Sequence, residues 1–494
     1  MKHYLGVDIG TFESKGVIVN GAGEIVASAA RAHQMLVPQP GWAEHDAEQD
    51  WWGDFDFITK KMLAESKVTP SSIAAIGTSG IGPCMLPVDK DGAPLMKGVL
   101  YGVDTRAARE IDELTAEIGA EVILDRCGNA LTSQSVGPKI LWLKRNHPEL
   151  FARTHKILNS TSLLVHRLTG NYTIDHYSAC GSSPFYMADR LCWSDELAPS
   201  HFSMELMPDL LWTTDVAGHV TAKAAAETGL AIGTPVIAGT IDAAAEAVSV
   251  GVLKSGDLML MYGSTIFIIL ITPNRVKDQR LWYAPWLFPG QHASMAGLAT
   301  SGTLTHWFRQ NFAKELPTET AIITLSAEAE ASPPGAKGLL VLPYFSGERT
   351  PIHDTRAKGL VFGLDLTHER GDIFRAVLEG IAHGTKHVFD SYSECGQAPK
   401  AVYAVGGGTQ NRPWSQATSD IGGVTQIVRQ KTIGASYGDA FLAALALGDV
   451  RAADIETWNP VVSRINPRAE HAAAYGKQHA VFRGLYPATK SLLP

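Results

Sequence analysis

Short apolar runs alternate with longer Ala- and Glu-rich segments along the whole chain. The runs are rich in Val, Ile, Leu and Gly and have the length of buried strands, whereas the longer segments have the composition of helices. This alternation favours an α/β architecture in which helices cover sheets. Strands are predicted at 72–77, 235–238, 338–344 and 401–405, and helices at 105–118 and 372–392.

The first of two predicted β-hairpins opens the chain. An apolar run ends in the bend Asp8-Ile9-Gly10-Thr11, and a second run begins at Lys15. Gly10 lets the backbone approach a ligand, and Thr11 offers a hydroxyl and an N–H. Asp8 can hold a cation, and Lys15 can balance negative charge. These are the parts of a nucleotide phosphate site, although a plain hairpin with a buried Asp would give the same pattern.

The second predicted hairpin, at 257–272, carries the similar bend Tyr262-Gly263-Ser264-Thr265. Two such bends facing each other could hold one polyphosphate between them. Because 494 residues exceed what one ordinary core accommodates, we expect two domains, each opening with a hairpin.

Composition narrows the class of protein. With 45% hydrophobic and 19% charged residues the chain is typical of globular proteins, and its net charge of −8 argues against a nucleic-acid partner. Five scattered cysteines, none in a C-x-x-C pair, indicate neither a disulfide framework nor a zinc site. The first strand leaves no room for a signal peptide, and the longest apolar stretch is too short to span a bilayer. We therefore expect a reduced, cytoplasmic protein with no membrane partner.

Asp242 follows a short strand and a Gly239-Thr240 turn, at the start of an Ala-rich helix. A carboxylate in this place is either an N-cap or a fixed, partly buried base beside a phosphate site. The local sequence leaves both interpretations open.

A glycine loop, Gly406-Gly407-Gly408, follows the strand predicted at 401–405. It allows close backbone approach to a ligand, but it could equally be a flexible turn. Together with residues 433–440 it could form the floor and wall around a flat base. Trp42, Trp51 and Trp52 could stack on a sugar, although packing is the favoured interpretation.

Several ordered motifs resemble the FGGY family of carbohydrate kinases, and the resemblance covers nearly the whole chain. Residues 359–364 and 372–380 resemble the family's C-terminal signature, while 346–351 and 41–46 are most similar to its xylulose kinase branch. The resemblance implies two actin-like (ribonuclease H-like) domains, with ATP and sugar in the cleft between them. It implies that 1–247 bind sugar and phosphate and that 248–494 bind the nucleotide.

The resemblance also implies roles for individual residues. Asp242 matches the catalytic base, and Asp8 and Asp242 are expected to hold Mg²⁺. The expected phosphate-binding residues are Asp8, Gly10, Thr11, Lys15, Gly263, Ser264 and Thr265. The expected adenosine-binding residues are Gly406, Gly407, Gly408 and Asn411.

The sugar side departs from the xylulose kinase branch. Ser79-Gly80-Ile81-Gly82-Pro83 stands where the branch has Gln-Met-His-Gly, and Gly102-Val103-Asp104-Thr105-Arg106 stands for Trp-Asn-Asp-x-Arg. Asp104 and Arg106 are kept. The expected substrate-binding residues are Ser79, Gly80, Ile81, Asp104, Arg106 and Asp242.

These observations predict an enzyme that uses ATP and Mg²⁺ to phosphorylate a hydroxyl of a small ketose or polyol, with a homodimer as the candidate assembly. Ribulose, erythritol, glycerol and gluconate are alternative substrates, and xylulose is not expected to lead by a wide margin. Two other classes remain open: a non-catalytic sugar-sensing protein on the same fold, and a nucleotide-driven actin-like or chaperone protein.

Overall fold

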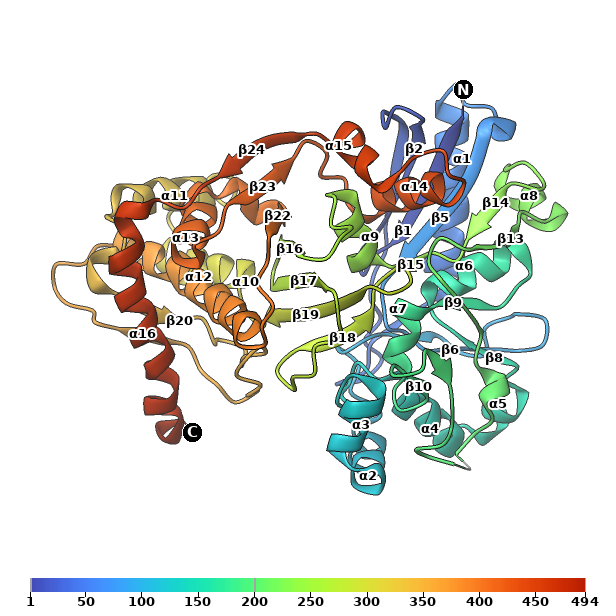
Figure 1. The fold of residues 1–494 in the computed structure, drawn as a ribbon, viewed down its shortest axis with the longest axis horizontal. Helices are drawn as coiled ribbons and strands as arrows, with labels where there is room; N and C mark the ends of the chain where they lie inside the picture. The colour runs from blue at the N-terminus through green and yellow to red at the C-terminus, as the bar shows by residue number, and fades with distance from the viewer. Residues whose placement is uncertain (1, 200, 494) are drawn as a thin grey trace.

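Two seven-stranded sheets, each covered by helices, form the two halves of the molecule (Figure 1). The structure is a computed structural model and describes residues 2–199 and 201–493. Met1, Ser200 and Pro494 belong to the predicted domain ranges but lie outside the described residues.

The first sheet is built around the N-terminal hairpin. Its central strand β1 runs antiparallel to β2, with Asp8 opposite Lys15, and parallel to β5, with Asp8 beside Ser79. The sheet contains β1 (His3–Ile9), β2 (Glu13–Asn20), β3 (Ile25–Ala32), β5 (Ile73–Gly80), β13 (Val216–His219), β14 (Pro235–Ile237) and β15 (Thr240–Ile241).

The second sheet repeats this plan. Its strand β16 runs antiparallel to β17 and parallel to β22, so the second hairpin occupies the position that the first has in its own sheet. The sheet contains β16 (Asp257–Tyr262), β17 (Ile266–Thr272), β18 (Trp282–Pro285), β19 (His292–Leu298), β22 (Ala401–Val405), β23 (Gln426–Arg429) and β24 (Val461–Ile465). Both predicted hairpins are therefore confirmed.

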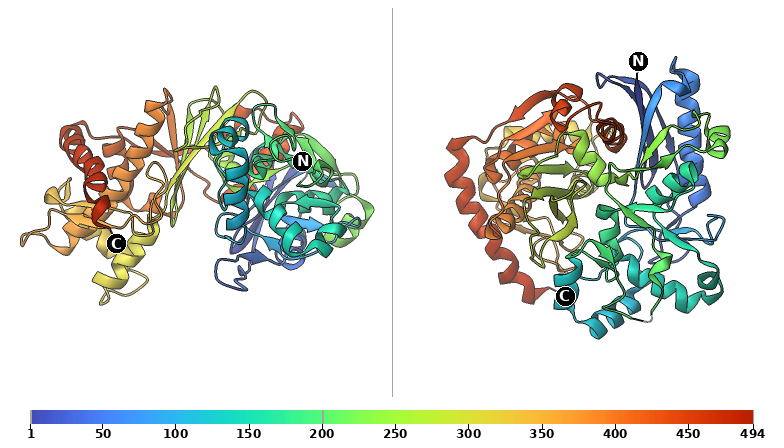
Figure 2. Two further views of the ribbon diagram at one scale, coloured as in Figure 1. Left: turned by 90° about the horizontal axis from the view of Figure 1, so that it is seen from below. Right: turned by 45° about the vertical axis from the view of Figure 1, so that its right-hand side comes forward.

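Helices cover the sheets, and the two views of Figure 2 show the halves side by side. The main helices of the first half are α1 (Gly53–Glu65), α2 (Ala108–Ile118), α4 (Val136–Asn146), α6 (Ser160–Thr169) and α9 (Asp242–Ser249). Those of the second half are α10 (Gly302–Phe312), α11 (Ala321–Ala331), α12 (Arg370–Glu394), α13 (Arg412–Gly422), α14 (Ala435–Ala446) and α16 (Ala472–Thr489). Within the described residues, no helix is both long enough and apolar enough to cross a membrane.

The predicted elements are found with small shifts at their ends. The strand predicted at 338–344 is β20 (Leu340–Leu342), which pairs only with β21 (Leu360–Phe362) outside the two large sheets. The helix predicted from Thr105 begins at Ala108, because Asp104 accepts hydrogen bonds from the backbone and side chain of Arg106 in the preceding turn.

Helix α14 comes late in the chain but packs against the first sheet, beside β1 and β5 (Figure 1). Two glycines of the sheet permit this contact: an added Cβ would lie 1.9 Å from the Ser436 carbonyl oxygen at Gly6 and 2.2 Å from that of Asp439 at Gly77. Gly438 in turn lets α14 approach α9, where an added Cβ would lie 1.9 Å from the Ala245 carbonyl oxygen. Of residues 433–440, residues 434–440 are buried, and the backbones of Ser436 and Asp439 lie against the first sheet. A contact of this segment with a nucleotide base stays a prediction. The division between residues 247 and 248 falls near the end of α9 and stays a prediction.

Candidate active site

Asp242 is the first residue of α9 and directly follows β15, which pairs with β5. The N-cap of this helix is Ile241, and the Asp242 carboxylate accepts only the adjacent N–H of Ala243 at 2.6 Å. The interpretation of Asp242 as an N-cap is therefore wrong. Burial raises the pKa of Asp242 well above its ordinary value, and the negative charges of Asp8 and Glu246 raise it further.

Three other acids share the surroundings of Asp242. Burial raises the pKa of Asp8 to about 6, although the hydrogen bond from Ser79 and the charge of Lys15 act to lower it. Burial and the charge of Asp8 raise the pKa of Glu246 to about 7. The pKa of Asp439 is also raised well above its ordinary value, first by burial and then by the charge of Asp8. This end of the first sheet therefore concentrates negative charge that a cation or a proton can relieve.

The donor chemistry of Asp8 and Asp242 fits a magnesium ion. Mg²⁺ prefers oxygen ligands and is commonly bound by one or two carboxylates together with substrate phosphates and water. Within the residues that the structure describes, no group of three or more His, Cys, Asp or Glu side chains is arranged to hold a metal. A magnesium ion at this place would depend on the nucleotide for part of its coordination.

The first bend, between β1 and β2, is held by two histidines that the sequence analysis did not identify. His33 Nε2 lies 3.0 Å from the Gly10 carbonyl oxygen and its Nδ1 lies 2.8 Å from Asp54 Oδ2. Both partners are acceptors, so both ring nitrogens donate. Burial alone would lower the pKa of His33, but the hydrogen bond and charge of Asp54 outweigh it and raise the pKa. An imidazolium ion therefore supports the bend.

His45 supports the same bend in its neutral form. Its Nε2 donates to the Thr11 carbonyl oxygen at 3.1 Å, and its Nδ1 accepts the indole N–H of Trp51 at 3.1 Å. Burial and the charge of His33 lower the pKa of His45 to about 4. The spacing of these histidines in the sequence matches no ligand motif, so only their place in the fold reveals them.

Lys15 lies beside the acids with its side chain partly exposed. Its ammonium group pairs with Glu13 at 3.2 Å. Its charge also acts to lower the pKa of Asp8 and of Glu246, against the larger effect of burial. An ion pair this exposed holds the side chain weakly. Lys15 therefore stays available to an incoming anion.

The second bend, Gly263–Thr265, is held by backbone N–H groups and by the hydroxyls of Ser301 and Thr303, which donate to the Gly263 and Ser264 carbonyl oxygens at 2.9 Å each. The carbonyl oxygen of Ser264 accepts N–H groups of Ser301 and Thr303, and that of Gly263 accepts the N–H of Gly302 at 3.0 Å. These donors open helix α10, so the positive end of its dipole lies beside the bend. No ionisable side chain belongs to this bend.

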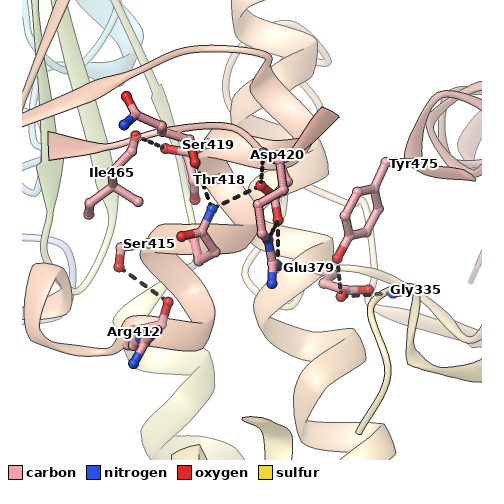
Figure 3. Close-up of polar contacts among 12 residues, drawn as sticks. Gly335, Glu379, Arg412, Ser415, Thr418, Ser419, Asp420, Ile465 and Tyr475 are labelled. Atoms are coloured by element: carbon pink, nitrogen blue, oxygen red, sulfur yellow. Dashed lines mark hydrogen bonds and ion pairs between the residues drawn. The ribbon is translucent and has the colours of Figure 1, made fainter. Parts of the chain in front are cut away.

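The glycine loop follows β22 and lies against the end of β16. An added Cβ at Gly406 would lie 2.5 Å from the Tyr262 carbonyl oxygen, whereas one at Gly407 would meet open space. Asn411 caps α13 by accepting the Trp414 N–H at 3.2 Å. Figure 3 shows the helix that follows, with the Ser415 hydroxyl bonded to the Arg412 carbonyl and that of Ser419 to Ile465. The loop is thus anchored at both ends.

Figure 3 also shows what fixes the helices behind this loop. Glu379 of α12 accepts hydrogen bonds from the Tyr475 hydroxyl at 2.7 Å and from the Gly335 N–H at 3.0 Å. The first of these bonds joins α16 to α12. Asp420 of α13 accepts Arg468 Nη2 at 2.6 Å. The helices behind the glycine loop are therefore fixed by a network of polar contacts, those of Glu379 fully buried.

Asp104 and Arg106 face each other rather than an open pocket. Both side chains are fully buried, Arg106 Nη2 lies 2.8 Å from Asp104 and 2.8 Å from Glu44, and the guanidinium stacks 3.9 Å from the Trp42 ring. Asp104 also accepts the Ala43 N–H at 2.7 Å. This pair fixes the 41–44 segment, and its contact with a sugar stays a prediction. The ring of Trp42 packs against the Arg106 guanidinium, which agrees with packing as the favoured interpretation of this residue.

Residues Ser79–Ile81, which are expected to form one wall of the sugar site, offer no free side-chain polar group. The Ser79 hydroxyl is buried between Asp8 and Asp439, and Ile81 is buried. Tyr101 was missed by the sequence analysis: its hydroxyl lies 3.1 Å from Thr11 Oγ1, and its carbonyl oxygen accepts from buried Lys139. Its pKa is raised by burial and by the charge of Asp242, which indicates that Tyr101 lines the same site.

Comparisons with known proteins agree with this architecture. Residues 3–249 match the N-terminal domain and residues 258–447 the C-terminal domain of the FGGY family of carbohydrate kinases. The chain is 28% identical to the xylulose kinase of Bacillus subtilis (strain 168), over 100% of this chain and 98% of that protein. It is 25% identical to the gluconokinase of Bacillus licheniformis, over 98% and 95% of the two chains. The crystal structure of xylulose kinase from Rhodospirillum rubrum superposes with a TM-score of 0.93 at 31% identity, covering 99% of both chains.

Proposed function

The chain belongs to the FGGY family of carbohydrate kinases, and on this premise we propose that it phosphorylates a hydroxyl of a small ketose of the xylulose type. It is an ATP-dependent carbohydrate kinase with two actin-like α/β domains. The identity of the sugar, the metal and the roles of single residues are the proposed part.

The observation that carries the proposal is the state of Asp242. Its carboxylate is partly buried, caps no helix and lies within the field of Asp8. A carboxylate with a raised pKa is a stronger base than one in water. Asp242 would therefore accept the proton of the sugar hydroxyl as that oxygen attacks the γ-phosphorus of ATP.

The two bends would bind the phosphates of ATP from opposite sides. Backbone N–H groups of Gly10, Thr11, Ser264 and Thr265 would donate to the phosphates, since the glycine in each bend carries no side chain that would block approach. The Gly263 N–H already donates to the Thr265 carbonyl oxygen at 3.1 Å, so Gly263 would contribute close approach only. Lys15 would balance the charge on the transferred group. Asp8 and Asp242 would hold Mg²⁺, which supplies positive charge to the phosphate oxygens when bound.

The other two classes receive less support. A sugar-sensing protein without activity would be expected to lose Asp242 or the bend glycines, and this chain has both. The family match over both halves favours a sugar kinase over a nucleotide-driven chaperone. The net charge of −8 supports the absence of a nucleic-acid partner, and the homodimer stays a prediction.

The wall at Ser79–Ile81 suggests that discrimination between sugars is modest. A site that hydrogen-bonds a particular hydroxyl rejects analogues lacking it, because a buried polar group is then left unpaired. Here the Ser79 hydroxyl already has two carboxyl partners, so this wall has little with which to read a sugar.

The proposal is tested by steady-state kinetics with xylulose, ribulose, erythrulose, glycerol, erythritol, gluconate and their enantiomers, following ADP release. We expect D-xylulose among the best acceptors, with kcat/KM less than about 10²-fold above the next sugar. A larger margin would contradict modest discrimination. ADP release that no acceptor stimulates would contradict the kinase itself.

A further inference from the structure

Asp439, on a helix late in the chain, is connected to an acid of the first half through one serine side chain. It lies on α14, and its fully buried side chain reaches Ser79 at the end of β5. Ser79 Oγ lies 2.7 Å from Asp439 Oδ2 and 3.1 Å from Asp8 Oδ1. One serine hydroxyl therefore bridges an acid of the second half to the acid that ends β1.

The backbone fixes the position of this bridge. Gly77, two residues before Ser79, leaves space for the Asp439 carbonyl oxygen, which an added Cβ would meet at 2.2 Å. Gly438, next to Asp439, packs against the Ala245 carbonyl oxygen of α9, the helix that begins with Asp242. The Asp439 carboxyl group can therefore hardly move without moving α14 or α9.

Counting hydrogens shows how the bridge works. Ser79 has one hydroxyl hydrogen, so it can donate to only one of the two carboxyl groups, and the other contact needs a proton on a carboxyl oxygen. Asp439 is the more deeply buried acid, and its Oδ1 has no hydrogen-bond partner among the described residues. An ionised carboxylate is costly in such surroundings. The hydrogen-bonded chain from Asp439 through Ser79 to Asp8 satisfies both contacts of the serine hydroxyl.

We propose that Asp439 is a positioning residue for phosphoryl transfer, which fixes the carboxylate of Asp8 through the hydroxyl of Ser79. The inference rests on the proposed role of Asp8 in the kinase reaction. It also gives the departure at Ser79 a function that differs from sugar recognition, since the same hydroxyl completes the bridge.

The test is a double-mutant cycle of Asp439→Ala, Ser79→Ala and the double variant, with kcat and thermal unfolding measured for each. Removing a group that orients a ligand of the reacting centre typically lowers activity by about 10- to 100-fold. We expect each single variant to lose roughly tenfold in kcat, and the double variant to lose no more than either, because both act through one hydrogen-bonded chain.

Two further variants separate positioning from simple packing. Asp439→Asn keeps a hydrogen-bonding group of the same size without charge, so we expect its kcat within about threefold of the unmodified enzyme. The matched control is Ser162→Ala on α6, where the hydroxyl is likewise buried and has no partner among the described residues. It should leave kcat unchanged.

Losses that multiply in the double variant would overturn the proposal, as would an Asp439→Asn enzyme as slow as Asp439→Ala. An Asp8→Asn enzyme keeps the two outcomes apart. If Asp8→Asn retains full activity, the proposed role of Asp8 fails; if it is slow while Asp439→Ala is not, only the inference about Asp439 fails.

Discussion

The two hairpin bends have the same backbone plan but opposite chemical character. The first ends a strand with Asp8, faces Lys15 and rests on the charged ring of His33. The second, Gly263–Thr265, has no ionisable group and rests on backbone N–H groups that open α10. We therefore propose that two copies of one architecture have divided the work, with the first half supplying charge and the second supplying oriented dipoles.

The division extends to the surroundings of the bends. Near the first, burial raises the pKa values of Asp8, Asp242, Glu246 and Asp439, and the charge of Asp8 adds to the rise at the other three. Such shifts are typical of groups that exchange protons or cations during a reaction. We infer from this comparison that the proposed proton transfer and the proposed binding of ATP can be altered separately, by substitutions in different halves.

Among these variants, Asp242→Asn should lower kcat the most, because it removes the base that the first half is proposed to supply. Loss of a positioned base is expected to lower kcat by about 10³-fold, while ATP binding, which depends on both bends, stays within a few-fold. Single-turnover kinetics and calorimetry measure the two quantities. Glu246→Gln, one turn later on α9, is the matched control and should lose much less, because its pKa of about 7 leaves it partly protonated at neutral pH. Near-normal turnover of Asp242→Asn would remove this residue from the mechanism.

Alanine at the bend glycines should sharpen the contrast between halves. At Gly10 the new methyl group would lie 2.5 Å from the Glu13 carbonyl oxygen, so the bend must shift, at a cost of about 1–3 kcal/mol in stability. At Gly263 it would lie 3.3 Å from the Thr265 carbonyl oxygen, a contact that needs only a small adjustment.

We therefore expect both variants to weaken ATP binding by about tenfold, or ~1.4 kcal/mol, and to affect sugar binding less. Only Gly10→Ala should also lower the unfolding temperature. Calorimetry and thermal unfolding separate these effects. Sugar binding that falls more than ATP binding would show that the nucleotide and sugar sides are assigned the wrong way round.

The smallest expected effect is the response to mild acid. Asp242 must be ionised to accept a proton, and because its pKa is raised, protonation removes the base at a higher pH than for an ordinary Asp. Activity should therefore fall with decreasing pH, and the fall should begin at a higher pH than an ordinary Asp base would give. A pH profile of kcat/KM measures this, and the residual activity of Asp242→Asn should lack that limb. A profile that stays flat down to pH 3.8, the ordinary pKa of Asp, would contradict the raised pKa.

The sequence predicted the hairpins and their bends because these depend on neighbouring residues. Apolar runs and small bend residues follow from local spacing, and the structure adds the register that places Asp8 opposite Lys15. The start of α9 at Asp242 followed in the same way from the Gly-Thr turn before an Ala-rich run.

The support of the site could not be predicted, because it joins residues far apart in the chain. Ser79 meets Asp439 only because α14 returns to the first sheet, and His33 meets Gly10 only after β3 has turned back. A signal for the first contact was present: Gly6 and Gly77 interrupt buried strands, which often marks a close backbone approach. The strand sequences do not indicate which segment approaches these glycines.

The place of α14 against β1 and β5 has a consequence for biosynthesis. A ribosome completes α9 at Ser249, yet the helix that covers the same sheet begins only at Ala435. At elongation rates of about 5–20 residues per second, the apolar face of β1 and β5 stays uncovered for roughly 10 to 40 s. The N-terminal half thus leaves the ribosome as an unfinished body, exposed to aggregation and to chaperones, until nearly the last helices of the chain have been translated.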